Sequence, residues 1–342
     1  MLIFIVRRIL QLPLVLFGVS ILIFGVTQFL APDVRAASYI TSEKQLSQLP
    51  AIIERYGLDK SVFVQYGNWL GNVFQGNLGW SASARVPVAE ALANRLPATL
   101  ELTFFAIIPI VFFGVLAGMI SGVQRNKWPD QINRVLAIFS FSLPSFVVGI
   151  TLIAVFYGTL KINGNPFLPI GRANDLFLLV NDYPSSGFLI FKALFTGNWE
   201  VFGHLMLRLV LPIVTLMVVL TGALMRVVRS SMIDQLEQDY VRTAKAKGLA
   251  AQRITFKHVL RNALIPVITL VGGLLYNLVS GVTITETVFN YPGVGAFAGQ
   301  AAVQVDIPGV LGFALFAALS ITLINLVVDI LYGVVDPRIR YD

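Results

Sequence analysis

Residues 239–266 read Asp-Tyr-Val-Arg-Thr-Ala-Lys-Ala-Lys-Gly-Leu-Ala-Ala-Gln-Arg-Ile-Thr-Phe-Lys-His-Val-Leu-Arg-Asn-Ala-Leu-Ile-Pro, an amphipathic stretch in a chain that is otherwise largely apolar. The pattern predicts two amphipathic helices separated at Gly248, because glycine readily adopts the positive φ that ends many helices. Asp239 is expected to be the N-cap of the first helix, since its carboxylate can accept a hydrogen bond from a free first-turn amide. The second helix is expected to run from about Ala250 into the next apolar segment.

Both predicted helices carry positive charge. Lys245 and Lys247 fall in the last turn of the first helix, where cations offset the partial negative charge of the helix end. On the second helix, Arg253, Lys257 and Arg261 recur every four residues and therefore share one face. Two interpretations are open from these residues alone: an element that docks on a partner, or a solvated basic loop that only orients the chain.

The composition is that of an integral membrane protein. Of the 342 residues, 56% are hydrophobic and 13% are charged, whereas soluble domains carry about a quarter charged residues. The mean hydropathy is +0.78. The chain has no cysteine, which excludes disulfides and thiolate metal sites. Its two histidines, His204 and His258, are far apart in sequence, so no metal site is expected.

Six apolar stretches are long enough, at about 20 residues each, to cross a membrane as helices. They are residues 9–30, 99–122, 134–160, 205–227, 264–288 and 309–335. Basic residues gather at the N-terminus, in the 123–133 and 228–263 loops and in the C-terminal tail, whereas the 289–308 loop has no Lys or Arg. The positive-inside rule therefore predicts that both termini and residues 239–266 are cytoplasmic, and this distribution of the net charge of +7 argues against nucleic-acid binding.

These spans are expected to form a single all-α transmembrane domain over residues 1–342. Residues 31–98 are predicted to be a long extracytoplasmic loop with amphipathic segments. Residues 161–204, which are rich in proline and glycine, are a second predicted extracytoplasmic excursion. Residues 228–263 form the predicted cytoplasmic loop between the fourth and fifth spans.

Three glycines of the second span recur every four residues, which is typical of a face that allows close helix packing. They are Gly114, Gly118 and Gly122. Pro109, Pro144 and Pro212 fall within or at the edge of spans and are expected to mark bending points, with or without a functional role.

The fifth span supplies the candidate residues of a transport path or gate, which are Asn277, Gly281 and Glu286. Gly273, Asn277 and Gly281 share one face, and that face suits either helix packing or, because Asn277 is polar at mid-membrane depth, a water-filled path. Glu286 lies near the outer end of the span, where a wet or helix-end environment and a gate or partner contact are both open.

The sequence lacks three residue patterns that are typical of enzyme active sites. There is no glycine-rich Lys-Ser/Thr phosphate loop, no His-Glu-x-x-His pair and no Gly-x-Ser-x-Gly elbow. No catalytic residue is therefore expected, and no metal or cofactor bound by this chain.

The chain resembles the membrane permease subunits of ABC importers for dipeptides and oligopeptides, and specifically the first of the two paired permeases. The likeness covers nearly the whole length and rests on a series of fragments in a fixed order. They are Ile5–Leu10 with Gly18-Val19-Ser20, Tyr56–Lys60, Gly76–Gly79, Arg95–Leu102, Asp239–Gly248, Arg261–Pro266, Glu286–Phe289 with Tyr291–Gly293, and Val335–Tyr341.

Such importers carry a cytoplasmic motif, Glu-Ala-Ala-x3-Gly followed by Ile-x-Leu-Pro. Matched on Gly248, this sequence has Arg242, Thr243 and Ala244 in the first three places. Leu260 keeps the leucine, and Arg261 replaces the proline. The resemblance implies that the family's coupling role is retained, while any contact made by its glutamate differs here.

The resemblance implies a type I ABC importer permease fold in a prokaryotic cell membrane. It implies two separate ATPase subunits that carry ATP and Mg, a paralogous permease as heterodimer partner, an extracytoplasmic substrate-binding protein, and no nucleic acid. The residues implied in ATPase coupling are Asp239, Tyr240, Arg242, Ala244, Lys247, Gly248 and Leu249. The small Ala244 and Gly248 are expected to let the helix approach the ATPase closely.

Other functions stay open at this stage. An importer of the same family for nickel, glutathione or an oligosaccharide would share these fragments. A stand-alone secondary carrier is disfavoured, because no ionisable residue lies clearly at the centre of a span. A receptor or assembly factor would use residues 239–263 to recruit a partner without transport.

Overall fold

The computed structural model describes residues 2–36, 39–40, 49–162, 164–181, 183–184 and 186–335. The basic tail that was expected on the cytoplasmic side, with Arg338 and Arg340, lies outside the described residues. Within them the fold is helical, as predicted, apart from two antiparallel hairpins. These pair β1 (Trp80–Ser81) with β2 (Val86–Pro87), and β3 (Lys161–Ile162) with β4 (Asn165–Pro166).

Four described helices are long and apolar enough to cross a membrane. They are α1 (Leu2–Thr27), α5 (Val88–Val123), α10 (Trp199–Leu236) and α17 (Ile307–Val335). Two bent helix pairs bring the number to six if each pair is one span. They are α6 (Trp128–Ser142) with α7 (Ser145–Leu152) and η3 (Ile153–Thr159), bent by 98°, and residues Ala251–Ala263 with α14 (Ile265–Val279), bent by 54°.

The predicted third span, 134–160, is therefore not a continuous helix. Helix α6 ends at Ser142, and Leu143 has the extended backbone (φ −87°, ψ 122°) favoured before a proline. Pro144 then precedes α7 as its N-cap. Of the three prolines, Pro144 marks the sharp bend, whereas Pro109 and Pro212 lie inside α5 and α10 without ending them.

The predicted fifth span, 264–288, is also divided. Helix α14 stops at Val279, and Gly281 follows with φ +92°. Glu286 then belongs to a separate short helix, α15 (Thr283–Val288). The expected rigid run from Ala250 into the span is interrupted at Leu264, where the 54° bend falls next to Pro266.

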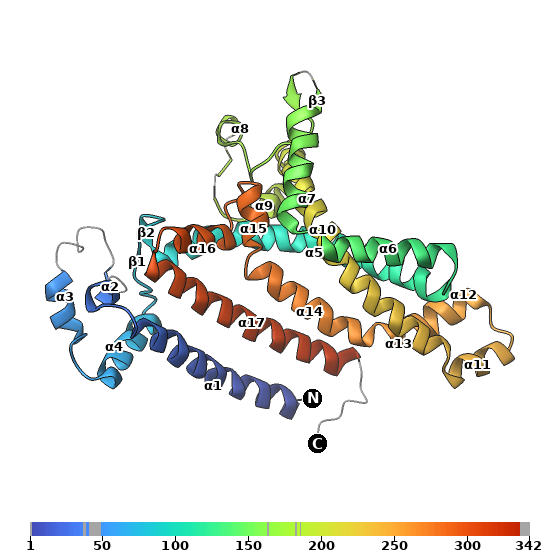
Figure 1. Cartoon of the computed structure of the whole chain (residues 1–342), viewed down its shortest axis with the longest axis horizontal. Coiled ribbons are helices and arrows are strands. Elements are labelled where there is room, and N and C mark those ends of the chain that lie inside the picture. Colours follow the sequence, from blue (N-terminus) through green and yellow to red (C-terminus); the bar gives the residue numbers. More distant parts are fainter. Residues whose placement is uncertain are drawn as a thin grey trace.

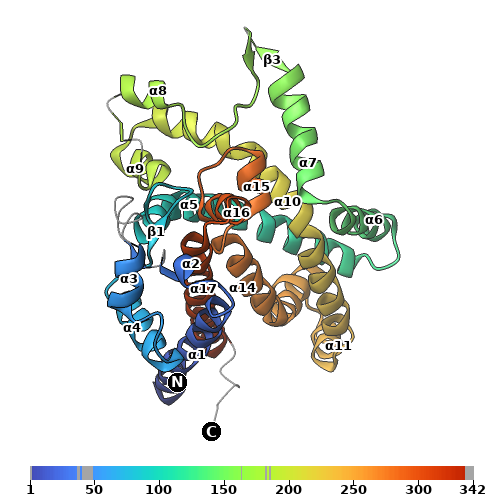
Figure 2. The ribbon, with the colours of Figure 1, turned by 60° about the vertical axis from the view of Figure 1, so that its left-hand side comes forward.

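The short helices lie at the ends and along one side of the bundle (Figure 1; Figure 2). They are α2 (Pro32–Ala36), α3 (Leu49–Tyr56), α4 (Val62–Phe74), α8 (Asp175–Val180), α9 (Leu189–Thr196), α11 (Asp239–Ala246) and α16 (Val294–Val303). Helices α2, α3 and α4 lie at the left of Figure 1, and α11 lies at the right end. Helices α1 and α17 pack on each other in opposite directions, so the start of α1 and the end of α17 lie at the same end of the bundle.

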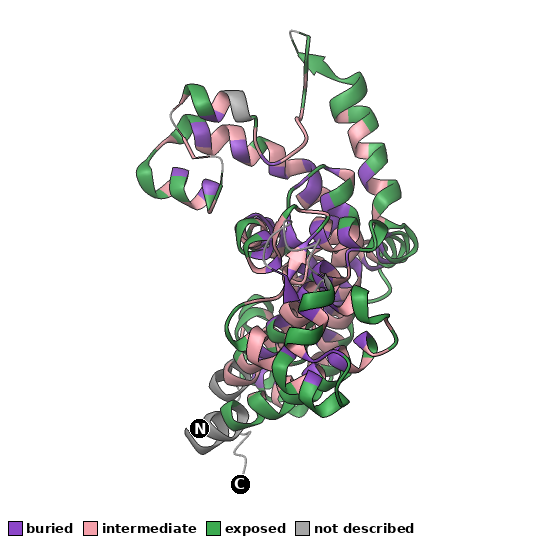
Figure 3. Cartoon of the chain, turned by 90° about the vertical axis from the view of Figure 1, so that its left-hand side faces the viewer, coloured by how far each residue is buried: buried purple, intermediate pink, exposed green. Residues whose placement is uncertain are grey.

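Helix α5 packs on α10 more extensively than any other pair of described elements, and buried residues gather in the middle of the bundle (Figure 3). The glycine row predicted for packing lies in this contact. A Cβ added to Gly118 would lie 2.6 Å from the Cβ of Val228, too close for real side chains. Each glycine of α5 lies against one side chain of α10: Gly114 against Leu224, Gly118 against Val228 and Gly122 against Met232. The predicted close packing of this row is confirmed, and the two helices run in parallel.

We expect Gly118→Ala to destabilise the protein, because the added methyl would meet Val228 and, at 2.7 Å, the Met225 carbonyl oxygen. Overpacking of this kind costs about 1–3 kcal/mol. Thermal unfolding of the purified protein in detergent measures the effect. Gly273→Ala is the matched control, since an added Cβ there has no atom within 4 Å, and it should unfold at the wild-type temperature or slightly above. Equal unfolding temperatures for the two variants would contradict the packing.

Candidate functional site

The predicted coupling segment, residues 239–263, called the coupling segment below, begins just after α10 ends. Gln238 is the N-cap of α11, with an extended backbone (φ −72°, ψ 152°). Asp239 is the first helical residue, so the prediction that it is the N-cap was wrong. Its side chain is 94% exposed and lies 3.3 Å from the guanidinium of Arg242. Its negative charge still lies at the positive end of the helix dipole.

Gly248 ends α11 with φ +74°, as the sequence predicts. The Leu249 amide donates to the Ala244 carbonyl and the Gly248 amide donates to the Lys245 carbonyl, at 3.3 and 2.9 Å. This pair of bonds is the Schellman arrangement, which satisfies the last free carbonyls of a helix. A Cβ added to Gly248 would have no atom within 4 Å, so the requirement for glycine comes from the left-handed backbone and not from a close neighbour.

One face of α11 is buried against the chain itself. Val241 is fully buried and Ala244 is 8% exposed, and both pack in a cluster with Val228 and Met232 of α10. The small side chain of Ala244 therefore faces the protein's own core, which corrects the expectation that it lies toward a partner. The exposed face of α11 consists of Asp239, Arg242, Thr243, Lys245 and Ala246, continued by Lys247. Tyr240 lies at its edge, and its hydroxyl bonds to the Gln235 side chain at 2.8 Å.

The second part of the segment starts at Ala251, after an Ala250 N-cap, close to the predicted start. It consists of α12 (Ala251–Arg253), the π-helical η4 (Ile254–Val259) and α13 (Leu260–Ala263). Its apolar side packs inward through Ile254, Val259 and Ala263. Arg253, Lys257 and Arg261 are all exposed, so the predicted basic face is open.

An apolar groove of about 520 Å³ lies beside the coupling segment. Phe256 and Leu260 line one part of it, and the rest comes from α5, α14 and Val328 of α17. Every residue that lines the groove is apolar.

At the other end of the bundle, the Glu286 carboxylate is fully buried. It accepts hydrogen bonds from the Thr99 hydroxyl at 2.8 Å and the Ala296 amide at 2.7 Å. Ala296 lies in the first turn of α16, so the carboxylate caps that helix. Glu286 thus occupies a helix end, as one interpretation held, and its carboxylate is buried and not wet.

Of the other two path candidates, Gly281 lies beside Glu286, because a Cβ added to Gly295 would lie 2.8 Å from the Gly281 carbonyl carbon and 2.9 Å from Glu286 Oε2. Asn277 is exposed on α14, and its side-chain amide donates to the Gly273 carbonyl at 3.0 Å. Gly281 is needed both for its positive φ and because an added Cβ would lie 2.4 Å from the Gly295 amide nitrogen. Close packing on α14 occurs at Gly272, where an added Cβ would meet Val328 at 2.4 Å, and not at the predicted Gly273.

A second buried carboxylate was missed by the sequence analysis. Glu101 is fully buried and lies 2.6 Å from the guanidinium of Arg172, itself 7% exposed. The same carboxylate accepts the Ile190 and Phe191 amides in the first turn of α9, at 2.7 and 3.3 Å. Helix α5 therefore binds the first turn of α9 through Glu101. Two residues earlier, the Thr99 hydroxyl accepts the Val294 amide and binds the first turn of α16. No sequence spacing links Glu101 with Arg172, although an acidic residue at the edge of a span was a usable indication.

The phenol of Tyr291, on the connection between α15 and α16, lies in the same region. It is buried, and burial raises the pKa of Tyr291 above its ordinary range, so the phenol stays protonated.

The ends of α5, α6 and α10 that lie nearest residues 239–263 are joined at Asp130, which is fully buried. Its carboxylate accepts two bonds from Arg229, at 2.6 and 2.9 Å, and one from the Asn126 amide at 2.9 Å. The Ser121 hydroxyl also donates to it. Four donors satisfy both oxygens of the carboxylate, so this group is a structural junction beside the coupling segment.

Metal ligands do not gather in the part of the chain that the structure describes, which has no group of three or more His, Asp or Glu placed to hold an ion. His204 stacks on Phe177, with ring centroids 3.9 Å apart, and accepts a hydrogen bond from Arg208 at 3.1 Å.

Comparison with known proteins identifies the family. The family described as binding-protein-dependent transport system inner membrane component matches residues 114–341, and the N-terminal model of such membrane components matches residues 1–103. The chain is 39% identical over 331 residues to the probable D,D-dipeptide transport system permease protein DdpB of Escherichia coli K12, covering 96% of this chain and 94% of that protein.

Two further relatives match along the whole chain. The di/tripeptide transport system permease protein DppB of Pseudomonas aeruginosa is 36% identical, over 100% of this chain and 99% of its own. The glutathione transport system permease protein GsiC of Escherichia coli O6:H1 is 34% identical, over the full length of both. With its long apolar helices, the chain is a multi-pass plasma-membrane protein. It belongs to the family of binding-protein-dependent transport system inner membrane components.

Proposed function

We propose that this chain is the pore-forming permease subunit of an ATP-driven importer of dipeptides or oligopeptides. The observation that carries the proposal is the identity of 36–39% with two peptide permeases along nearly the whole chain. The chain is not itself catalytic, and ATP and Mg bind on separate ATPase subunits.

The proposed topology has six spans, with each bent pair counted as one, and both termini in the cytoplasm. The antiparallel packing of α1 on α17 supports this topology, because it places the start of α1 and the end of α17 at the same end of the bundle. The arginines and lysines of the coupling segment then lie on the cytoplasmic side, as the positive-inside rule requires.

In the proposed mechanism, the exposed face of α11 docks on an ATPase subunit. Asp239, Arg242 and Lys247 supply polar contacts, while Gly248 and Leu249 fix the turn that presents the helix. Because Val241 and Ala244 pack on α10, movement of α11 displaces α10 and, through the glycine row, α5. The ATPases supply the free energy, since ATP changes their own association and shifts the transporter between states.

Two further partners complete the proposed complex. A paralogous permease covers the apolar groove beside Phe256 and Leu260 and forms the other half of the pathway. A substrate-binding protein delivers peptide at the opposite end, where Thr99 and Glu101 of α5 hold α16 and α9 in place.

Glutathione is the second candidate substrate, because the glutathione permease GsiC is 34% identical over the full chain. Glutathione is itself a modified tripeptide, so both candidates belong to one chemical class. Uptake of a labelled dipeptide by the reconstituted complex, with excess glutathione as competitor, separates them. Dipeptide uptake that unlabelled dipeptides but not glutathione reduce supports the first proposal, whereas ATP-dependent uptake of labelled glutathione without uptake of the dipeptide supports the second.

Ala246→Trp is expected to abolish ATP-dependent uptake and the co-purification of ATPase subunits, because it puts a bulky side chain on the exposed face of α11. The fold should be unaffected, since Ala246 is exposed. Gln131→Trp, at another exposed site on the same side of the protein, is the control and should keep both properties. Normal ATPase retention by Ala246→Trp would rule out docking through this face.

Glu286→Gln is expected to lower the unfolding temperature while uptake per assembled complex stays near the wild-type value. The amide presents an NH2 group to buried donors, and a buried unsatisfied group costs about 1–3 kcal/mol. The exposed Glu200→Gln is the matched control and should change neither quantity by much. Unchanged stability together with lost uptake would show instead that Glu286 acts as a gate.

A further inference from the structure

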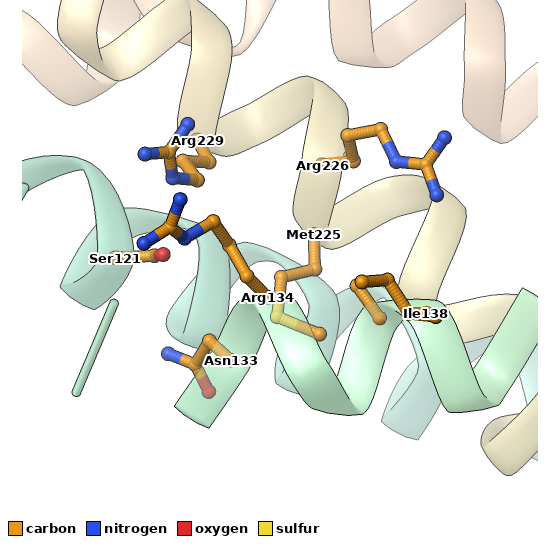
Figure 4. Close-up of a pocket in the computed structure, with 8 residues that line it drawn as sticks. Ser121, Asn133, Arg134, Ile138, Met225, Arg226 and Arg229 are labelled. Atoms are coloured by element: carbon orange, nitrogen blue, oxygen red, sulfur yellow. The ribbon is translucent and has the colours of Figure 1, made fainter. Parts of the chain in front are cut away.

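A cationic pocket of about 240 Å³ lies between α6 and α10, beside the inner end of α5. Its polar lining consists of Ser121, Asn133, Arg134, Arg226 and Arg229. Figure 4 shows Arg134 and Arg229 directed toward one another with Ser121 beside them, and Arg226 on the other side of Met225. None of the residues that line the pocket is acidic.

The three arginines of the pocket share one carboxylate, that of Asp130, so their charge is only partly neutralised. Arg229 is matched by Asp130, whose two oxygens are already occupied by four donors. Arg134 lies 3.9 Å from that carboxylate, beyond hydrogen-bonding distance, and its side chain is 50% exposed. Arg226 has the Phe141 ring as neighbour, with its guanidinium carbon 5.5 Å from the ring centroid, and is also exposed. Arg134 and Arg226 are therefore exposed and only weakly partnered, and their guanidinium groups have donors available for an anion.

The surroundings of the pocket point to the membrane. Beyond Arg134, α6 exposes a series of large apolar side chains, among them Ile138 at 61% and Phe141 at 73%. Trp128, which is 72% exposed, lies at the start of the same helix, and tryptophan is enriched at membrane interfaces. Exposed arginines beside an apolar face, at one end of a helix bundle, match the position of a lipid phosphate with its acyl chains alongside.

We infer that the pocket between α6 and α10 binds the phosphate of an anionic phospholipid in the cytoplasmic leaflet, through Arg134 and Arg226. Guanidinium groups bind phosphate oxygens strongly, and basic pockets between spans on the cytoplasmic side attract anionic headgroups. The assignment to the cytoplasmic leaflet rests on the proposed topology. The binding of a phosphate rests on the arginines of the pocket alone. A bound lipid would join α6 to α10 next to Asp130 and so support the end of the bundle from which α11 extends.

The test is native mass spectrometry of the delipidated full chain with added phosphatidylglycerol, phosphatidylcholine or inorganic phosphate. We expect preferential binding of phosphatidylglycerol, and a loss of affinity of about 30-fold in the double variant Arg134→Gln, Arg226→Gln. Arg253→Gln, Lys257→Gln is the matched control, with the same change of charge at exposed positions away from the pocket, and it should bind as the wild type does. Size-exclusion chromatography and circular dichroism establish that both variants are folded.

Several results would overturn the inference. They are equal binding of the two lipids, unchanged affinity in the pocket variant, and tight binding of inorganic phosphate that the lipid does not displace, which would identify a free-phosphate site. A photo-crosslinker at Arg134 that captures a subunit of the assembled complex instead of lipid would assign the pocket to a protein contact. Because no ATP or substrate is present, failure here is distinguishable from failure of the proposed transport function.

Discussion

The close contact between α5 and α10 is the constraint on which the rest of the structure depends. Three glycines spaced by four residues leave no room for a Cβ against Leu224, Val228 and Met232, so these side chains pack directly on the backbone of α5. Lipid gives apolar helices little reason to associate, so close packing of this kind is a main source of stability within a membrane.

The same two helices connect the opposite ends of the protein. At one end α5 presents Thr99 and Glu101, which bind the first turns of α16 and α9. At the other end α10 holds Asp130 through Arg229 and supports α11 through Val228 and Met232. The buried carboxylates are satisfied by helix N-termini or arginines, which makes their burial tolerable. A displacement of α11 therefore has a continuous packed route to the outer elements.

Patterns local in sequence predicted much of this arrangement. The apolar stretches, the turn at Gly248, the start near Ala250 and the packing of the 114–122 row follow from composition, backbone preference and helical spacing. The failures are non-local. Ala244 faces α10 and the Glu286 carboxylate is fully buried. The Glu101–Arg172 ion pair joins two residues that no sequence periodicity relates. The chain bends by 98° at Pro144, whereas the helix continues through Pro212. A proline in the sequence therefore does not show whether its neighbours compensate for the missing backbone N–H.

The packing predicts that α5 and α10 move as one body when the coupling segment moves. Since the chain has no cysteine, Phe104→Cys on α5 and Ser230→Cys on α10 give two unique spin-label sites, both exposed. From the helical rise they lie about 24 Å apart along the axis. Electron–electron resonance of the assembled complex should give the same distance distribution without nucleotide and with ATP trapped. A shifted distribution in the ATP-bound complex would show that the helices slide, and would contradict the account.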